Sequence, residues 1–138
     1  MLRAVNLSIG AVLATYGLIY GSRLLVAKGQ LDRPEGMDNA HPRAQQAKLE
    51  GGAARALGAH QNAFEAFAPF AVAVVFASLG PAYAQRHDLI DGLAWAHFAS
   101  RVVYTGLYVG NIPSARTGLW LVGQGITTAL FIIALLAG

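Results

Sequence analysis

Two runs of polar residues recur at helical spacing within stretches that are otherwise apolar. In the first run, Asn62 and Glu65 are three residues apart, so their side chains are neighbours on one helix face. Arg55 precedes Asn62 by seven residues and Gly58 lies between them, so both share that face. Glu65 offers a carboxylate to an ammonium or guanidinium group, and Asn62 offers a donor and an acceptor. This face therefore has the groups needed to bind a charged amine.

The second run carries a permanent positive charge. It consists of His97, Arg101, Tyr104 and Tyr108. Their spacing of i, i+4, i+7 and i+11 makes one continuous polar stripe on a helix. Arg101 supplies guanidinium donors, and the tyrosines supply hydroxyl groups beside apolar rings. His97 taken alone fits a packing or hydrogen-bonding role better than the role of a ligand.

Two more arginines stand near the ends of apolar stretches. Arg23 follows Tyr16 and Tyr20 on one helix face, and Arg116 precedes another apolar stretch. Each arginine has a second interpretation, because a long basic side chain can extend from a buried position to the lipid headgroups. The tyrosines, and Trp120 with them, can likewise be aromatic anchors at a membrane border.

The composition of the chain indicates a membrane protein. Of its 138 residues, 55% are hydrophobic and 12% are charged, whereas soluble domains carry about 25% charged residues. The length allows one domain, residues 1–138. The absence of cysteine excludes disulfides, thiolate metal sites and a cysteine nucleophile. Any sulfur chemistry would therefore need a thiol from a ligand.

Four apolar stretches are each long enough to cross a bilayer, which takes about 20 residues. We predict spans at 2–27, 54–79, 89–109 and 118–137, the third being the least apolar. The first stretch is too long for the apolar part of a cleaved signal peptide, so we expect it to be retained. In the polar connection after it, residues 43–50 favour a short surface helix. The predicted fold is all-α, an integral membrane four-helix bundle.

Lysines and arginines gather in the first connection, which indicates the orientation of the chain. Lys28, Arg33, Arg43 and Lys48 lie there. Because cytoplasmic loops are enriched in these residues, we predict that the first and third connections face the cytoplasm and that both termini lie outside. Ser114, in the third connection, is expected to cap the fourth span. The net charge of +3 follows from this loop bias and gives no reason to expect nucleic acid.

Together the polar faces place three arginines, a glutamate, an asparagine and two tyrosines near one membrane border. Ionisable groups at a helix centre cost roughly 2.5–3.5 kcal/mol each on insertion and normally face a protein interior or a wet cavity. This set suits a polar anion that carries a charged amine, while apolar walls hold a lipid-like partner. The alternative is an ion pair between Glu65 and Arg101 that only fastens two helices. A small transporter using the same two groups would need an oligomer.

Other kinds of site find little support in the sequence. The four histidines show no spacing typical of metal ligands, so no metal site is predicted. No glycine-rich phosphate motif precedes a helix, and the spacing of Gly106 and Gly110 favours close helix packing. Ser100 and His97 lack a positioned acid, which argues against a hydrolase triad.

Several segments resemble the signature of the MAPEG family, the membrane-associated proteins in eicosanoid and glutathione metabolism. They are RALGAHQNAFE (55–65) with FAPF (67–70), RVVY (101–104) with Tyr108, and Pro113 with Arg116 and Thr117. The combination of Asn-x-x-Glu with Arg-x-x-Tyr-x-x-x-Tyr is fairly specific. The resemblance covers essentially the whole chain, including the four-span plan and the long first connection.

The resemblance implies a homotrimer in which glutathione binds between adjacent subunits near the cytoplasmic border. Asn62 and Glu65 would hold the peptide, with Glu65 facing the glutathione amine. Arg116 matches the arginine thought to stabilise the glutathione thiolate. The other pocket residues implied by the resemblance are Arg101, Tyr104, Tyr108 and, reaching in from the neighbouring subunit to a carboxylate, Arg23.

The implied function is that of a glutathione transferase or a peroxidase-like enzyme that acts on a lipophilic electrophile. Its partners would be other copies of the chain, membrane lipid and the lipophilic substrate. A non-catalytic scaffold or accessory subunit of the same fold is the alternative.

The chain departs from the family pattern at two places. Gly58 stands where well-known eukaryotic enzymes have an arginine, and the stretch from Tyr108 to Arg116 is one residue longer than in some members. Both changes affect glutathione contacts. The chain resembles bacterial members without an assigned substrate, so we expect it in a bacterial inner membrane.

Overall fold

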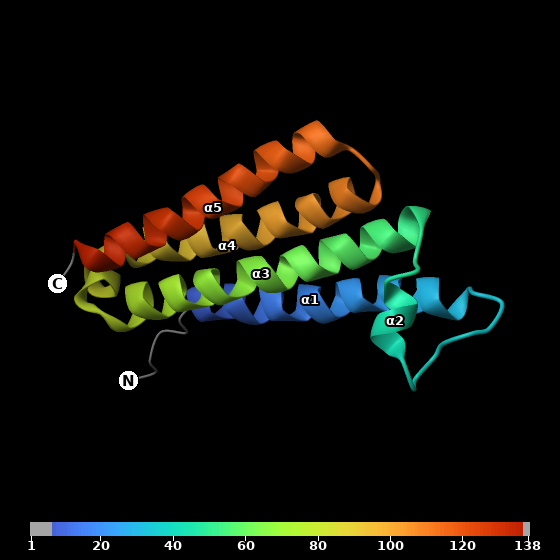
Figure 1. The fold of residues 1–138 in the computed structure, drawn as a ribbon. Helices are drawn as coiled ribbons and strands as arrows, with labels where there is room; N and C mark the ends of the chain where they lie inside the picture. The colour runs from blue at the N-terminus through green and yellow to red at the C-terminus, as the bar shows by residue number, and fades with distance from the viewer. Residues whose placement is uncertain (1–6, 137–138) are drawn as a thin grey trace.

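The computed structural model describes residues 7–136 and contains five helices in chain order (Figure 1). Their bounds are α1 Leu7–Leu31, α2 Pro42–Gln46, α3 Gly51–Leu79, α4 Pro81–Val109 and α5 Pro113–Leu135. No strand occurs between residues 7 and 136, which confirms the all-α class for that part of the chain.

The ends of α3 at Leu79 and of α4 at Val109 coincide with the predicted span ends, but other helix ends differ from the prediction. The first helix was expected to end at residue 27 but continues to Leu31. The third span was expected to begin at residue 89, yet α4 begins at Pro81, directly after Gly80. The polar residues before 89 are therefore helical, and a non-helical Arg86 (φ −138°, ψ 27°) marks a kink between the two parts of α4.

Proline sets the start of two helices. Pro81 and Pro113 occupy the first turn of α4 and α5, where the missing N–H is unpaired anyway and the fixed φ suits a helix. Ile112 is consequently the N-cap residue of α5, and the expectation that Ser114 caps it is wrong. The short surface helix is present but ends at Gln46 rather than at residue 50. Residues 2–6 and 137 of the expected spans lie outside the described residues.

The four long helices pack side by side. α1 contacts α3 and α4, and α5 contacts α3 and α4. At their centre Phe70 and Ile90 are fully buried among alanines such as Ala73, Ala77 and Ala94. Small residues at these positions allow the helix backbones to approach closely, which is how helices associate in a membrane.

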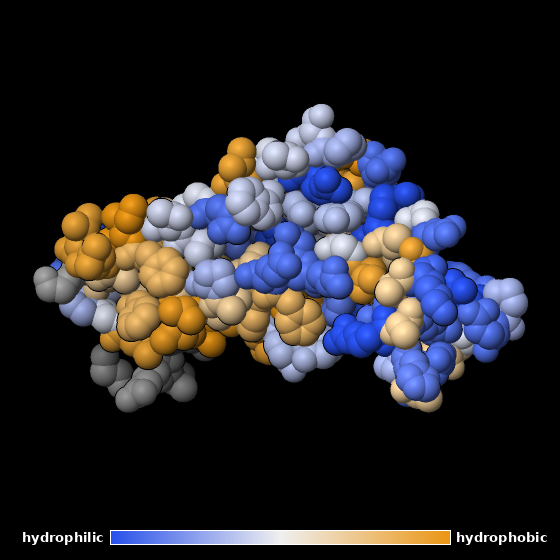
Figure 2. All heavy atoms as spheres, viewed as in Figure 1, coloured by the Kyte–Doolittle hydropathy of each residue, from blue (hydrophilic) through white to orange (hydrophobic). Residues whose placement is uncertain are grey.

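Many large apolar side chains are exposed on the outer faces of the long helices. By length and composition, α1, α3 and α5 can each cross a membrane. α4 is as long, but Arg86, Asp88, Asp91 and Arg101 lower its apolar content, and the span at 89–109 remains a prediction. Figure 2 shows hydrophilic residues gathered over the end with α2 and hydrophobic residues over the opposite end.

Candidate functional site

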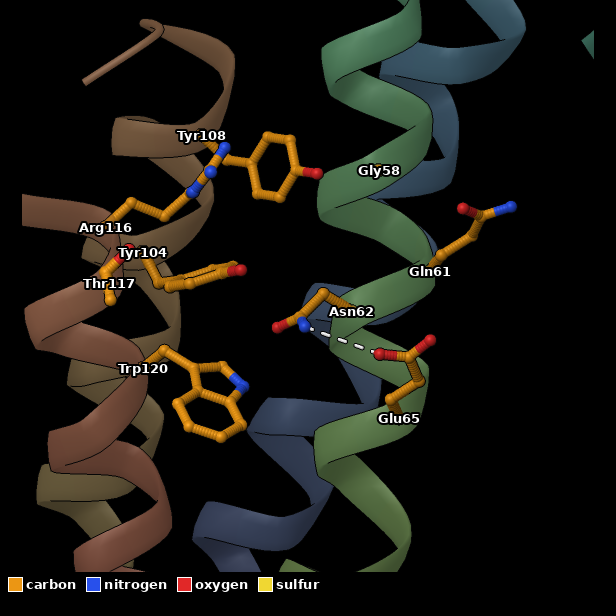
Figure 3. A pocket seen from close by; sticks show the side chains of 9 residues that line it. All are labelled: Gly58, Gln61, Asn62, Glu65, Tyr104, Tyr108, Arg116, Thr117 and Trp120. Carbon is orange, nitrogen blue, oxygen red and sulfur yellow. Dashed lines mark hydrogen bonds between the residues drawn. The ribbon is translucent and has the colours of Figure 1, made fainter. Parts of the chain in front are cut away.

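A pocket of about 340 Å³ opens between α3 on one side and α4 and α5 on the other (Figure 3). This volume is at the low end of the range of about 300–1,000 Å³ that is common for small-molecule sites. The lining residues come from all three helices and are Gly58, Gln61, Asn62, Glu65, Tyr104, Tyr108, Arg116, Thr117 and Trp120. Five of the seven site residues expected from the sequence therefore meet at one place.

Arg101 lies behind the pocket wall rather than in it. The residue is 2% exposed, and its Nη2 donates to Asn62 Oδ1 at 2.6 Å. Its guanidinium carbon lies 4.1 Å from the ring centroid of Tyr104. These contacts fix the orientation of Asn62, so that its amide nitrogen is turned towards Glu65 (Nδ2 to Oε2, 3.5 Å).

A direct ion pair between Glu65 and Arg101 is not among the salt bridges of residues 7–136. The amide of Asn62 stands between the two charges instead. Glu65 is exposed, and no cation pairs with its carboxylate in the described part of the chain. The alternative that the two charges only fasten helices together is therefore not supported by the geometry.

Arg116 stands on the wall opposite Glu65. Its guanidinium carbon lies 4.3 Å from the ring centroid of Tyr108, and the rings of Tyr108 and Tyr104 meet edge to face at 5.8 Å. No carboxylate of residues 7–136 pairs with this guanidinium. The pocket thus has an anion on one wall and a cation on the other, an arrangement that complements a zwitterionic ligand.

Arg23 does not line the pocket of its own chain. Its Nη2 donates to Gln30 Oε1 at 3.1 Å, while its Nη1 is buried and has no hydrogen-bond partner. Gln30 is in turn bonded to Gln45 and Gln46, which hold the first connection against α1. A role for Arg23 in the pocket of a neighbouring subunit stays a prediction.

Four lining residues were not among the predicted site residues, namely Gly58, Gln61, Thr117 and Trp120. Trp120 was interpreted as a possible anchor, but it follows Arg116 by four residues and so shares its helix face. That spacing could have predicted that Trp120 lies beside Arg116 in the site. Gly58 was placed on the helix face of Asn62 and noted as a departure from a family pattern, but nothing in the sequence singled out Gln61. Figure 3 shows that the Gln61 side chain points away from the facing helices.

The buried histidine of α4 has a packing role, as expected. The ring of His97 stacks on that of Phe70, with centroids 3.8 Å apart and planes 7° from parallel. Within the described residues, no three His, Asp or Glu side chains are placed to hold a metal ion.

The described part of the chain is all-α, and three of its helices are able to cross a membrane. It also has a polar pocket near the turn between α4 and α5. These features define the class of helical membrane proteins. A sequence model of the MAPEG family matches residues 7–136. The chain belongs to the MAPEG family, which includes glutathione transferases and peroxidases. Neither the search of curated proteins nor the search of solved structures found a match.

Proposed function

We propose that this protein is a membrane enzyme that activates the thiol of glutathione and transfers it to a lipophilic electrophile, or uses it to reduce a lipophilic peroxide. The observation that carries the proposal is the placement of Glu65 and Arg116 on facing walls of one pocket. Neither charge pairs with an opposite charge among residues 7–136, so both are available to a ligand.

The residues present fit the functional groups of glutathione. Glutathione carries an ammonium group, two carboxylates, peptide amides and a thiol. Glu65 suits the ammonium group, and Asn62, held by Arg101, offers its amide to the peptide. Arg116 supplies a permanent positive charge to the sulfur or to a carboxylate.

The proposed chemistry depends on ionising the thiol. A free thiol with a pKa near 8.5 is mostly protonated at neutral pH. A neighbouring guanidinium favours the thiolate, which is the nucleophile. In the transferase reaction the sulfur forms a bond to an electrophilic carbon, and the leaving group departs with its electron pair. In the peroxidase reaction the thiolate attacks the peroxide, the O–O bond breaks, and a sulfenic acid and an alcohol form. A second glutathione then gives the disulfide and water.

The exposed polar residues of α3 support assembly with further copies of the chain. Gln61 and Glu65 are both exposed in the middle of a helix that can cross a membrane. Such groups are costly against lipid and normally face protein or water. We propose a four-helix bundle that forms a homotrimer, with Arg23 of a neighbouring subunit completing the glutathione site. The resemblance to bacterial members supports a bacterial inner-membrane location, and the lysines and arginines of the first connection support both termini lying outside.

Replacing Arg116 tests the mechanism. In Arg116→Ala we expect the fraction of bound glutathione present as thiolate to fall roughly tenfold at neutral pH, since one pKa unit is a factor of ten. Arg116→Lys should retain part of the effect, because the charge remains without the planar guanidinium. The measurement is the ultraviolet absorbance of the thiolate, together with turnover of electrophile and hydroperoxide panels.

Arg33→Ala, in the exposed first connection, serves as the matched control and should leave the thiolate unchanged. Wild-type thiolate absorbance in Arg116→Ala would remove Arg116 from the mechanism. Glutathione binding without turnover of any substrate would favour a non-catalytic scaffold.

A further inference from the structure

Gly58 lies inside α3 at a point where the phenol of Tyr108, from α4, rests against the helix. A Cβ atom at position 58 would lie 2.5 Å from the Tyr108 hydroxyl oxygen, 2.8 Å from Cζ and 2.9 Å from Cε1. Cβ contacts in proteins are essentially never this short. Any side chain at position 58 would therefore displace the ring of Tyr108.

Apart from Gly29, where an added Cβ would lie 2.5 Å from the Cβ of Ala53, the other glycines in the long helices do not have this property. An added Cβ at Gly17, Gly92 or Gly106 would meet nothing within 4 Å. Glycine inside a helix is unfavourable compared with alanine, so the presence of glycine at a helix position needs a structural reason. At Gly58 the reason is the space taken by Tyr108, which also lines the pocket.

Tyr108 in turn supports Arg116. The guanidinium carbon of Arg116 lies 4.3 Å from the Tyr108 ring centroid, within the range of a cation–π contact. Figure 3 shows the phenol reaching from α4 towards α3, with the Arg116 side chain beside it. Gly58, Tyr108 and Arg116 thus form a chain of contacts from α3 to α5 across the end of the pocket nearest the α4–α5 turn.

We propose that Gly58 is a positioning residue: by leaving room for the Tyr108 phenol, it seats the ring that holds Arg116 towards the ligand sulfur and closes this end of the pocket. The inference rests on the proposed function, because the sulfur is the assumed target of Arg116. It also gives the departure from the arginine-bearing family pattern a structural meaning. In this chain, the space beside α3 is filled by an aromatic ring from the next helix.

The test compares Gly58→Ala with Gly106→Ala in the full-length protein. Gly58→Ala should displace Tyr108 and lower the equilibrium thiolate content of bound glutathione roughly 2- to 30-fold, the range of a cation–π contact. Gly106→Ala adds the same methyl group to a helix where nothing is near, and should leave the thiolate unchanged. Unchanged thiolate in a folded Gly58→Ala protein would overturn the proposal.

A second readout does not depend on glutathione. With 3-fluorotyrosine at position 108, the fluorine NMR signal should shift in Gly58→Ala and stay in place in Gly106→Ala. An unchanged fluorine signal in Gly58→Ala would overturn the proposal that Gly58 positions the Tyr108 ring. If the wild-type protein binds no glutathione but the fluorine signal shifts in Gly58→Ala, the proposed function is refuted. The positioning of Tyr108 by Gly58 is then still supported.

A third variant covers the case in which Gly58→Ala does not fold. Tyr108→Leu removes the ring without adding atoms at position 58, so Arg116 loses its support. It should lower the thiolate content as Gly58→Ala does. Wild-type thiolate in this variant would overturn the role of the ring in positioning Arg116.

Discussion

At the scale of single residues, the site depends on one amide placed between two charges. Asn62 accepts from Arg101 and donates towards Glu65, so it couples a buried guanidinium to an exposed carboxylate. A buried cation without a partner is costly, since a hydrogen bond to a charged group contributes about 1.5–3 kcal/mol. Asn62 therefore has a structural role as well as a proposed role in binding.

Replacement of Asn62 by leucine should reveal both roles. The buried guanidinium of Arg101 then loses its acceptor, and we expect about 1.5–3 kcal/mol of destabilisation, seen as a lower Tm. Glutathione affinity should fall with it. Gln61→Leu is the matched control, because the neighbouring Gln61 is exposed and points away from the facing helices. Equal Tm values for the two variants would contradict this assignment.

Asp38 makes a comparable local contact in the first connection. Its Oδ1 accepts from the backbone N–H groups of Ala40 and His41, and the hydrogen bond from His41 is the main cause that lowers the pKa of Asp38. A lowered pKa means that the contact stabilises the loop above the ordinary aspartate range. That stabilisation is lost as the pH falls through the lowered value.

The expected result is faster hydrogen exchange at Ala40 and His41 in acid, after correction for the intrinsic pH dependence. Asp38→Asn should show faster exchange already at neutral pH. Exchange at Val26, buried in α1, is the internal reference and should not change. Equal protection of the Ala40 amide from hydrogen exchange in the variant and the wild type would show that Asp38 does not stabilise this loop.

At the scale of helices, the sequence predicted which residues share a face but not how the faces meet. The spacing of Asn62 and Glu65, and of Tyr104 and Tyr108, follows from 3.6 residues per turn, and these residues do line one pocket. Which partner Arg101 takes depends on the relative height of α3 and α4. That height is a tertiary property, so the sequence analysis considered only Glu65 as a partner of Arg101, whereas the guanidinium donates to Asn62.

Helix boundaries were predicted less well for a related reason. Polar residues before Leu89 resemble a loop, but Pro81 starts a helix that continues through them. Asp91 explains part of this continuation, because its Oδ1 accepts from the backbone N–H of Ser8 and from the Tyr83 hydroxyl. A side chain of α4 thus accepts from the backbone of α1, a contact between residues 83 positions apart that no local pattern predicts.

Asp91→Ala should therefore destabilise the contact between α1 and α4. Loss of hydrogen bonds to a charged group costs about 1.5–3 kcal/mol each, which predicts a lower Tm and faster exchange at Ser8. Asp88→Ala is the control, since the Asp88 side chain is 98% exposed. A larger loss of stability in Asp88→Ala than in Asp91→Ala would contradict this account.

At the scale of the whole molecule, the exposed polar residues of α3 lie within a surface that carries many large apolar side chains. Large apolar side chains cover the outer faces, for example Leu24 at 70% and Leu79 at 79% exposure. The exposed polar groups of α3 interrupt this surface beside the pocket. A second copy that covers them would remove the cost of placing them against lipid.

Photo-crosslinking from position 61 tests this assembly. A benzoylphenylalanine in place of Gln61 should give covalent dimers and trimers in mild detergent, because we expect that face to lie against a neighbouring subunit. The same group in place of Lys28, an exposed residue at the loop end of α1, should crosslink much less. Monomers from both positions would refute the shared pocket.

The join between the first connection and α1 is made by neutral amides. Gln30 donates to Gln45 and accepts from Gln46, while Gln45 also donates to the carbonyl of Gly36. Amide groups do not change protonation in the physiological range, and their mutual hydrogen bonds are screened little by salt. These amide hydrogen bonds should thus persist when the surface potential of the membrane changes or when acid breaks the Asp38 contact.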